Sequence, residues 1–220
     1  MTRRLGWGKN PRAVSSPLSL RAPLLLGSAS PRRRELLVAA GVPLAVVSPA
    51  VDERVSGRER PSAYLERVAG AKLAAARALV PSLAPLAPRA VLVADTTVAL
   101  GDDILDKPAS AERARELLQT LSGRTHDVRT RFVLGAAETD DVLAAQTVTT
   151  RVTFRSLGDE EIHAYVASGE PFDKAGGYGI QGGAAGFVLR IEGSYTSVVG
   201  LPLAEVIAAL RVAGLLPCAT

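Results

Sequence analysis

The sequence has few of the residues that form disulfides and zinc sites. It contains one cysteine, Cys218, and two histidines, His126 and His163, among 220 residues. A single cysteine excludes an intramolecular disulfide, which fits a reducing compartment and leads us to expect a cytoplasmic protein. Two histidines far apart in the chain, without further cysteines, exclude a conventional zinc site.

Long hydrophobic runs are also missing. The longest apolar stretch, residues 36–51, is interrupted by glycine, serine and two prolines, whereas a membrane-spanning helix needs about 18 consecutive apolar residues. Residues 1–22 lack the apolar run of a secretory signal peptide. We therefore expect no transmembrane segment and no membrane partner.

The body of the chain has no basic excess. Residues 1–22 contain five basic and no acidic residues, while the remaining 198 residues carry 21 basic and 22 acidic side chains. A nucleic-acid-binding domain concentrates basic residues on its folded surface, so we expect no nucleic-acid partner. We interpret residues 1–22 as a basic, disordered extension; an Arg-rich transit peptide is the alternative.

What the sequence does contain is enough apolar residues, 47%, for a packed core. Short apolar runs between turn residues predict strands, and longer Ala- and Leu-rich segments predict helices. The expected strands cover residues 24–26, 42–48, 90–94, 97–105, 126–137, 142–155 and 187–191; the expected helices cover 31–40, 61–79, 111–121, 157–168 and 203–213; a Pro-rich loop covers 81–88. Because strands and helices alternate early and a long hairpin follows, the sequence predicts an α/β fold with a mixed central sheet and flanking helices.

A first candidate site lies where the first expected strand meets the first expected helix. Ser28, Ser30, Arg32 and Arg33 surround this junction, with Ser30 placed as N-cap and Pro31 as the first helical residue. Hydroxyls, guanidinium groups and the free N–H groups of a helix start suit a polyphosphate. The alternative is an ordinary helix cap followed by a solvated basic turn.

A second candidate group consists of carboxylates that follow expected strands. Asp95 comes directly after the apolar run of residues 90–94, and Asp52 and Glu53 follow residues 42–48. A carboxylate at the end of a buried strand can activate water or hold a divalent cation. With no His or Cys cluster, carboxylates and phosphate oxygens favour Mg²⁺ or Mn²⁺. Turn and cap aspartates are the alternative.

Lysine is rare, since only four lysines accompany 22 arginines. We therefore consider Lys72, Lys107 and Lys174 as sites where a compact ammonium group is needed, although each is more commonly a surface charge. Residues 177–182 spell a GxGxxG pattern, but a polar segment precedes it and a strand follows it, so a dinucleotide-binding fold is excluded. No P-loop pattern is present.

Eight short motifs occur in one order along the chain. They are SASPRR at 28–33, VDE at 51–53, ADT at 94–96, DKP at 106–108, SGRTH at 122–126, GEPFDKAG at 169–176, GIQG at 179–182 and VGLP at 199–202. With these motifs the chain closely resembles the Maf family of nucleoside triphosphate pyrophosphatases, which has been linked to septum formation. The resemblance covers about residues 24–213.

The resemblance implies a single domain over residues 23–216, with two lobes around a cleft, as in the inosine triphosphate pyrophosphatases. It implies hydrolysis of a nucleoside triphosphate to the monophosphate and pyrophosphate, with a divalent cation. The family's proton acceptor maps onto Asp95, and its specificity positions map onto Arg32, Thr96 and Gln181. These three residues match the branch acting on dTTP and UTP, with modified pyrimidine nucleotides as further candidates.

The family and residue interpretations agree on a set of site residues. We expect a phosphate clamp of Ser28, Ser30, Arg32, Arg33, Lys72 and Lys107, and metal or base roles for Glu53 and Asp95. Whether Asp95 takes a proton or only holds the metal stays open, as does assembly, with a homodimer as one option. A non-catalytic, nucleotide-binding regulator of cell division is the competing function.

Overall fold

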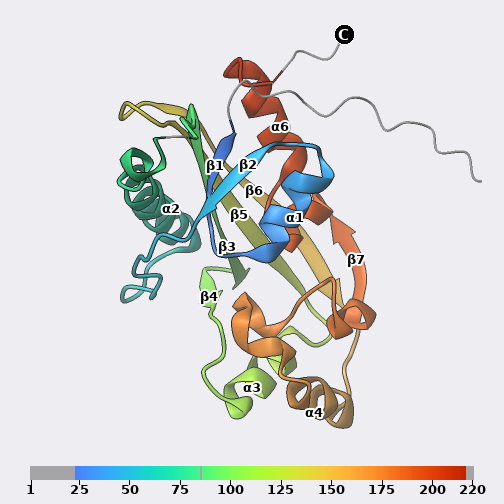
Figure 1. Cartoon of the computed structure of the whole chain (residues 1–220). Coiled ribbons are helices and arrows are strands. Elements are labelled where there is room, and N and C mark those ends of the chain that lie inside the picture. The colour runs from blue at the N-terminus through green and yellow to red at the C-terminus, as the bar shows by residue number, and fades with distance from the viewer. Residues whose placement is uncertain (1–22, 85, 217–220) are drawn as a thin grey trace, which may run out of the picture.

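One sheet of seven strands organises the molecule. The computed structural model describes residues 23–84 and 86–216; the expected extension at residues 1–22 and Cys218 lie outside the described residues. The strands are β1 (Leu24–Gly27), β2 (Leu44–Val47), β3 (Ala90–Leu100), β4 (Asp103–Leu105), β5 (Thr125–Ala136), β6 (Val142–Phe154) and β7 (Val188–Glu192). Their order is β2-β1-β3-β5-β6-β7, with β4 paired to β3 (Figure 1). Parallel pairs β1–β2 and β1–β3 join antiparallel pairs from β3 to β7, so the predicted mixed sheet is confirmed.

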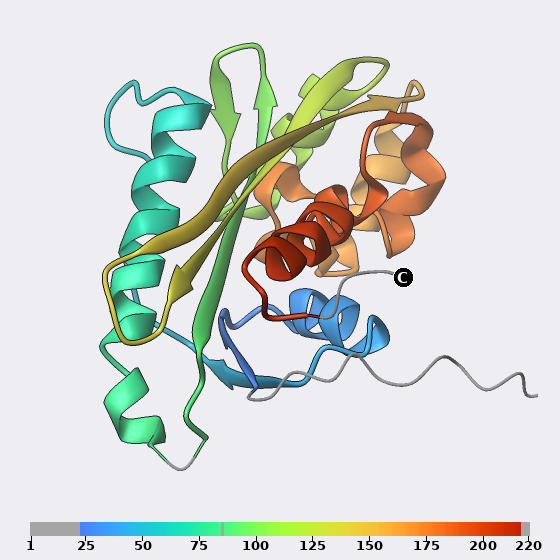
Figure 2. The same ribbon diagram turned by 90° about the horizontal axis from the view of Figure 1, so that it is seen from above.

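Helices cover both faces of this sheet, as Figures 1 and 2 show. They are α1 (Pro31–Ala39), α2 (Pro61–Arg77), α3 (Ala111–Leu121), α4 (Asp159–Ala167), α5 (Tyr195–Val199) and α6 (Leu203–Val212). Helices can pack on both faces because successive side chains of a strand point to opposite sides of the sheet, so each strand supplies apolar residues to both. Leu25 and Val91 pack with α2, whereas Leu26 and Leu92 pack with α1 and α6. Of the described residues, none lies in a helix long and apolar enough to cross a membrane.

A second hydrophobic core lies at the other end of the long strands. It contains residues of α3 and α4, including Leu118 and Ile162, together with Val128 of β5 and Phe154 of β6. The strands β3, β5 and β6 are long enough to contribute to both cores, so the two lobes share one sheet. This arrangement matches the two lobes that the family resemblance implies.

The structure corrects the expected position of Asp95. The two segments expected at residues 90–94 and 97–105 form one continuous strand over Ala90–Leu100 and then the short strand β4. Strand β3 pairs with β5 from Ala90–Ala136 to Ala99–Asp127, and the β-branched Thr96, Thr97 and Val98 favour extended backbone. Asp95 therefore lies in the middle of a strand, and the prediction that it ends one is wrong.

Two smaller expectations also differ from the structure. Residues 80–83 of the region expected to be loop form a 3-10 helix, Val80–Leu83. The short helix α5 and three 3-10 turns between residues 170 and 187 are absent from the sequence prediction. These elements are only three to five residues long, too short to show a hydrophobic period.

Candidate active site

All ten sequence-predicted site residues line a single cavity of about 1130 Å³. Its walls come from the β1–α1 junction, the segment between β2 and α2, helix α2 itself, the middle of β3, the segment after β4, the turns of residues 170–182 and residues 198–200. The predicted residues on these walls are Ser28, Ser30, Arg32, Arg33, Glu53, Lys72, Asp95, Thr96, Lys107 and Gln181. The fold thus brings together positions that are up to 153 residues apart in the sequence.

Asp95 and Lys72 form a buried ion pair in the wall of the cavity. Asp95 is 5% exposed and Lys72 is 7% exposed, and the Lys72 ammonium donates to Asp95 Oδ1 at 2.6 Å. Removing both charges from water is costly unless they are paired, so the pair depends on close contact. The second oxygen, Asp95 Oδ2, is buried without a hydrogen-bond partner among the described residues. One oxygen is held by Lys72, while the other makes no hydrogen bond within the described part of the chain.

Glu53 extends this pair into a chain of alternating charges. Its carboxylate contacts Lys72 Nζ at 2.7 Å and Lys107 Nζ at 3.1 Å. Burial raises the pKa of Glu53, but the hydrogen bonds and charges of Lys72 and Lys107 outweigh it and lower the pKa to about 2. Glu53 is therefore ionised at neutral pH. Asp95, Lys72, Glu53 and Lys107 form one continuous network on the cavity wall.

Arg33 is buried and directed toward other protein groups. Its guanidinium donates to the Gly200 carbonyl at 2.7 Å, to Ser28 Oγ at 3.1 Å and to Thr96 Oγ1 at 3.2 Å. Burial lowers the pKa of Arg33, while the charges of Asp95 and Glu53 act in the opposite direction. Arg33 thus holds the hydroxyls of Ser28 and Thr96 in place.

The neighbouring residues of the helix start are more open to the cavity. Arg32 has a side chain that is 32% exposed, with Nη1 3.6 Å from Asp173 Oδ2. Ser30 occupies the N-cap position of α1 with Pro31 following it, as expected, but its side chain makes no capping hydrogen bond. Its main-chain amide donates to Ser28 Oγ at 3.2 Å instead. The Ser30 hydroxyl therefore does not cap the N-terminus of α1.

Gln181 is exposed on a set of glycine turns that Glu170 organises. Glu170 Oε2 accepts from the Gly183 amide at 2.9 Å, and Oε1 accepts from the Tyr165 hydroxyl at 3.0 Å. A Cβ on Gly182 would overlap the Glu170 carboxylate. The second and third glycines of the GxGxxG pattern, Gly179 and Gly182, therefore reflect close packing against Glu170, in agreement with the exclusion of a dinucleotide fold. Glu170 was not among the predicted site residues.

The third rare lysine also lies on the cavity wall. Lys174 donates to the Glu170 carbonyl at 2.6 Å and to the Asp173 carboxylate. It thus stabilises the same turns that carry Gln181. All three lysines considered from the sequence face one site, which supports the argument from their rarity.

The acidic residues fit a divalent cation that arrives with a ligand. Among the described residues, no cluster of three or more His, Cys, Asp or Glu side chains forms a metal cage. However, Asp95 Oδ2 has no hydrogen-bond partner within residues 23–84 and 86–216, and Glu53 lies on the other side of Lys72. Mg²⁺ is often held by one or two carboxylates together with substrate phosphates. Asp95 and Glu53 can supply those carboxylates.

The structure is that of an α/β protein whose mixed sheet contributes to a cavity lined by charged side chains. The family model described as "Maf-like protein" matches residues 23–213, and the chain belongs to this family. The family expectation from the sequence motifs is thereby confirmed.

Curated relatives match most of the chain. A dTTP/UTP pyrophosphatase of Geobacter sp. (strain M21) is 47% identical over 193 residues, covering 88% of this chain and 96% of the relative. A dTTP/UTP pyrophosphatase of Salmonella typhimurium (strain LT2) is 48% identical over 183 residues, covering 83% and 88%. A third, of Myxococcus xanthus (strain DK1622), is 45% identical over 192 residues, covering 87% and 93%.

A solved structure, a nucleoside-triphosphatase (dITP/XTP pyrophosphatase) of Mycobacterium abscessus, has a TM-score of 0.33 at 14% identity, covering 60% of this chain and 72% of that chain. A likeness this slight supports no conclusion about the chain.

Proposed function

We propose that this chain is a nucleoside triphosphate pyrophosphatase that hydrolyses dTTP and UTP to the monophosphate and pyrophosphate. The observation that carries the proposal is the Asp95–Lys72–Glu53–Lys107 network, which runs from the buried Asp95–Lys72 pair to the exposed Lys107 in a cavity large enough for a nucleotide. Small-molecule sites commonly occupy about 300–1000 Å³. Relatives at 45–48% identity carry the same activity in their names.

The cavity can bind the triphosphate through several cationic and hydroxyl groups. Lys107 and Arg32 are partly exposed toward it, and Ser28 and Ser30 lie at the start of α1. Charge neutralisation and alignment of the phosphates are the main catalytic needs of phosphoryl transfer. The buried Arg33 contributes by holding the hydroxyls of Ser28 and Thr96 in place, not by exposing its guanidinium group to the triphosphate.

Asp95 is our candidate for accepting the proton of the attacking water. Lys72 holds Oδ1, which leaves Oδ2 to accept a hydrogen bond from water next to the α-phosphate. A divalent cation bound by Asp95, Glu53 and phosphate oxygens would neutralise charge on the triphosphate. Addition of EDTA should therefore abolish turnover, and excess Mg²⁺ or Mn²⁺ should restore it.

Gln181 is our candidate for recognising the base. A neutral amide can accept from the N3–H of uracil or thymine and donate to a ring carbonyl, whereas glutamate could only accept. Cytosine has an acceptor at N3 and an amine at C4, so the same amide orientation would set acceptor against acceptor at N3 and donor against donor at C4. Where the bound base buries such groups, leaving them unpaired can discriminate by roughly 10⁴–10⁵-fold, whereas size alone gives roughly 10–200-fold.

A panel of UTP, dTTP, CTP, GTP, ATP and 7-methyl-GTP, assayed for pyrophosphate with Mg²⁺ or Mn²⁺, tests the proposal. We expect kcat/KM for UTP and dTTP well above that for CTP, with poor values for the purines. Gln181→Glu should weaken UTP hydrolysis without changing the unfolding midpoint. A higher kcat/KM for CTP or 7-methyl-GTP than for dTTP would contradict the specificity. Nucleotide binding without hydrolysis of any member would favour a non-catalytic regulator.

A further inference from the structure

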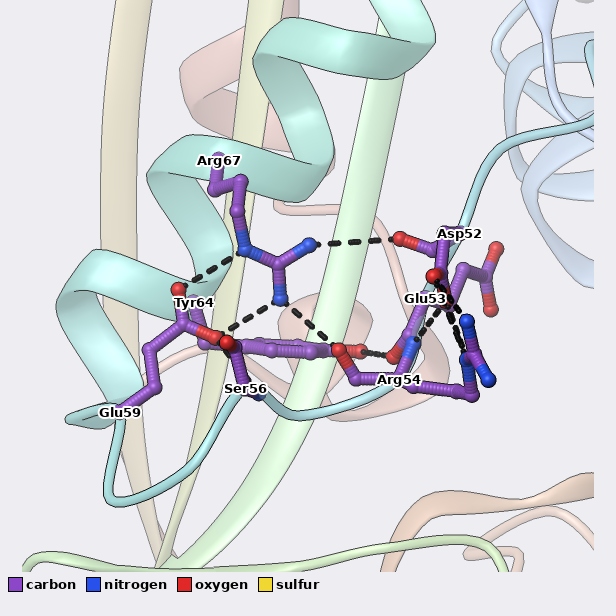
Figure 3. A network of polar contacts seen from close by, with 7 residues as sticks. All are labelled: Asp52, Glu53, Arg54, Ser56, Glu59, Tyr64 and Arg67. Atoms are coloured by element: carbon purple, nitrogen blue, oxygen red, sulfur yellow. Dashed lines mark hydrogen bonds and ion pairs between the residues drawn. The ribbon is translucent and has the colours of Figure 1, made fainter.

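The segment that carries Glu53 is held by side chains of α2. Arg67 Nη1 donates to the Asp52 carbonyl at 3.3 Å, and Arg67 Nη2 donates to the Arg54 carbonyl at 2.9 Å. Between them, the Tyr64 hydroxyl donates to the Glu53 carbonyl at 3.1 Å (Figure 3). Two side chains of one helix thus bind three consecutive carbonyls. The segment lies outside any helix or strand. These bonds therefore take the place of the main-chain hydrogen bonds that a helix or strand would provide.

Arg67 is itself fixed in orientation. Its Nε and Nη2 atoms bind both oxygens of Glu59 at 2.9 and 2.7 Å (Figure 3). Such bidentate pairs set the plane of the guanidinium group. The Arg67 Cζ atom also lies 5.6 Å from the centre of the Tyr64 ring, within the range of a cation–π contact. Arg67 and Tyr64 therefore act as one rigid clamp, with Glu59 as its support.

The same helix holds the other end of Glu53. Lys72, five residues after Arg67 on α2, binds the Glu53 carboxylate at 2.7 Å and Asp95 at 2.6 Å. Side chains of α2 thus bind both the main-chain carbonyl and the carboxylate of Glu53. If these hydrogen bonds to the main chain were lost, the carboxylate could move away from Lys72 and Lys107, because no residue of the segment is paired with a strand of the sheet.

We propose that Arg67, together with Tyr64, is a positioning residue that clamps residues 52–54 and so keeps the Glu53 carboxylate on the cavity wall. Arg67 does not line the cavity and acts only through residues 52–54, whereas Tyr64 also lines the cavity wall. The consequence for catalysis rests on the proposed pyrophosphatase activity, whereas the clamping of the segment does not. Loss of partners that orient a catalytic carboxylate typically costs roughly 10- to 100-fold in activity.

Arg77 provides a matched control on the same helix. It also donates to main-chain carbonyls, those of Ala136 at 3.0 Å and Asp140 at 3.3 Å, in the turn between β5 and β6. It does not line the cavity. If Arg67 only fastened α2 to a loop for stability, then Arg67→Met and Arg77→Met would lower stability alike and leave the activity of folded enzyme unchanged.

Hydrogen–deuterium exchange of the intact protein tests the clamp without reference to activity. We expect the amides of Arg54 and Ser56, which donate to Asp52 Oδ1 and Glu59 Oε2, to exchange at least about 10-fold faster in Arg67→Met than in wild type, and to be unchanged in Arg77→Met. Tyr64→Phe, which keeps the buried ring and removes only the hydroxyl, should show a smaller increase in the same segment. Wild-type exchange at Arg54 and Ser56 in both Arg67→Met and Tyr64→Phe would overturn the proposal.

A double-mutant cycle with Glu53→Gln tests the catalytic consequence. On UTP, we expect Arg67→Met to lower kcat/KM roughly 10- to 100-fold and Tyr64→Phe roughly 2- to 10-fold, with Arg77→Met unchanged. In the Glu53→Gln background, Arg67→Met should cause little further loss, because coupled residues are not additive. Equal losses in both backgrounds would overturn the proposal. Wild-type inactivity on every nucleotide would contradict the proposed function, while the exchange experiment would still decide whether the clamp exists.

Discussion

Asp95 has two carboxylate oxygens with different surroundings. Lys72 binds Oδ1 in a nearly dry part of the wall, and Oδ2 has no partner among the described residues. An asparagine at this position would keep the shape, but it would lose the negative charge that pairs with Lys72 and the oxygen that accepts a proton. This change therefore affects both the buried ion pair and the proton acceptor, so folding and activity have to be measured together.

We predict that Asp95→Asn lowers kcat roughly 10²–10⁴-fold, the usual effect of removing a general base. Asp102→Asn, in the exposed turn after β3 and away from the cavity, should retain wild-type kcat. Steady-state kinetics on UTP, with circular dichroism as a check of folding, measure both. A folded Asp95→Asn variant with near wild-type turnover would contradict the role of Asp95.

The buried His126 should make the free energy of unfolding depend on pH in mild acid. Burial lowers its pKa to about 4, against a smaller opposing effect of Asp127, and its Nε2 lies 2.7 Å from the Tyr178 hydroxyl. The unfolded chain binds the proton more readily, with a pKa near 6.5. The free energy of unfolding should therefore decrease as the pH falls from about 6.5 to about 4, by up to about 3 kcal/mol. Urea unfolding at several pH values should show this slope in wild type and a reduced slope in His126→Gln; an equal slope in both would show that His126 is not its source.

At the scale of elements, the sequence predicted most helices and strands but not their continuity. The apolar runs at residues 24–26 and 90–94 and the hairpin of residues 126–155 were evident because they alternate or cluster over several residues. Asp95 looked like the end of a strand, since a charged residue normally leaves the core. It stays inside β3 because Lys72, from a different element, neutralises it. A tertiary ion pair of this kind has no local signal.

The close packing of β1 on α2 predicts a cost for any side chain at Gly27. A Cβ there would lie 2.8 Å from Ala76 Cβ and 2.9 Å from Val93 Cγ1. We expect Gly27→Ala to lower the free energy of unfolding by about 1–3 kcal/mol, as overpacking does. Gly70→Ala on α2, where a Cβ meets nothing within 4 Å, should instead raise it by about 0.5–1 kcal/mol. Urea unfolding of both variants checks the pair, and a stabilising Gly27→Ala would contradict the packing.

At the scale of the whole molecule, the motifs predicted which residues meet but not how they contact one another. Rare lysines, the hydroxyls and arginines of the first helix start, carboxylates after apolar runs and the specificity positions of the family together indicated ten positions, and all of them line one cavity. The sequence did not indicate that Arg33 is directed toward Ser28, Thr96 and Gly200. It also missed Glu170 and Arg67, whose contacts are with main-chain groups of other segments. Such contacts depend on backbone paths that residue types alone do not reveal.

The family model begins at residue 23, and residues 1–22 carry the whole basic excess of the chain. We predict that deleting residues 1–22 leaves kcat/KM on UTP and the unfolding midpoint nearly unchanged. The truncated and full-length proteins should be compared under the same salt conditions, because added charges alter weak electrostatic effects. Strong loss of substrate affinity on truncation would mean that the extension contributes to the site.

The central claim is that this cavity directs water to the α-phosphate of a pyrimidine nucleoside triphosphate. The most direct measurement is product analysis by ion-exchange chromatography after incubation of the purified full-length protein with UTP and Mg²⁺. We predict UMP and pyrophosphate in equal amounts from the wild type, and a loss of both products in Asp95→Asn. Formation of UDP and inorganic phosphate, or equal product formation by the variant, would contradict the account.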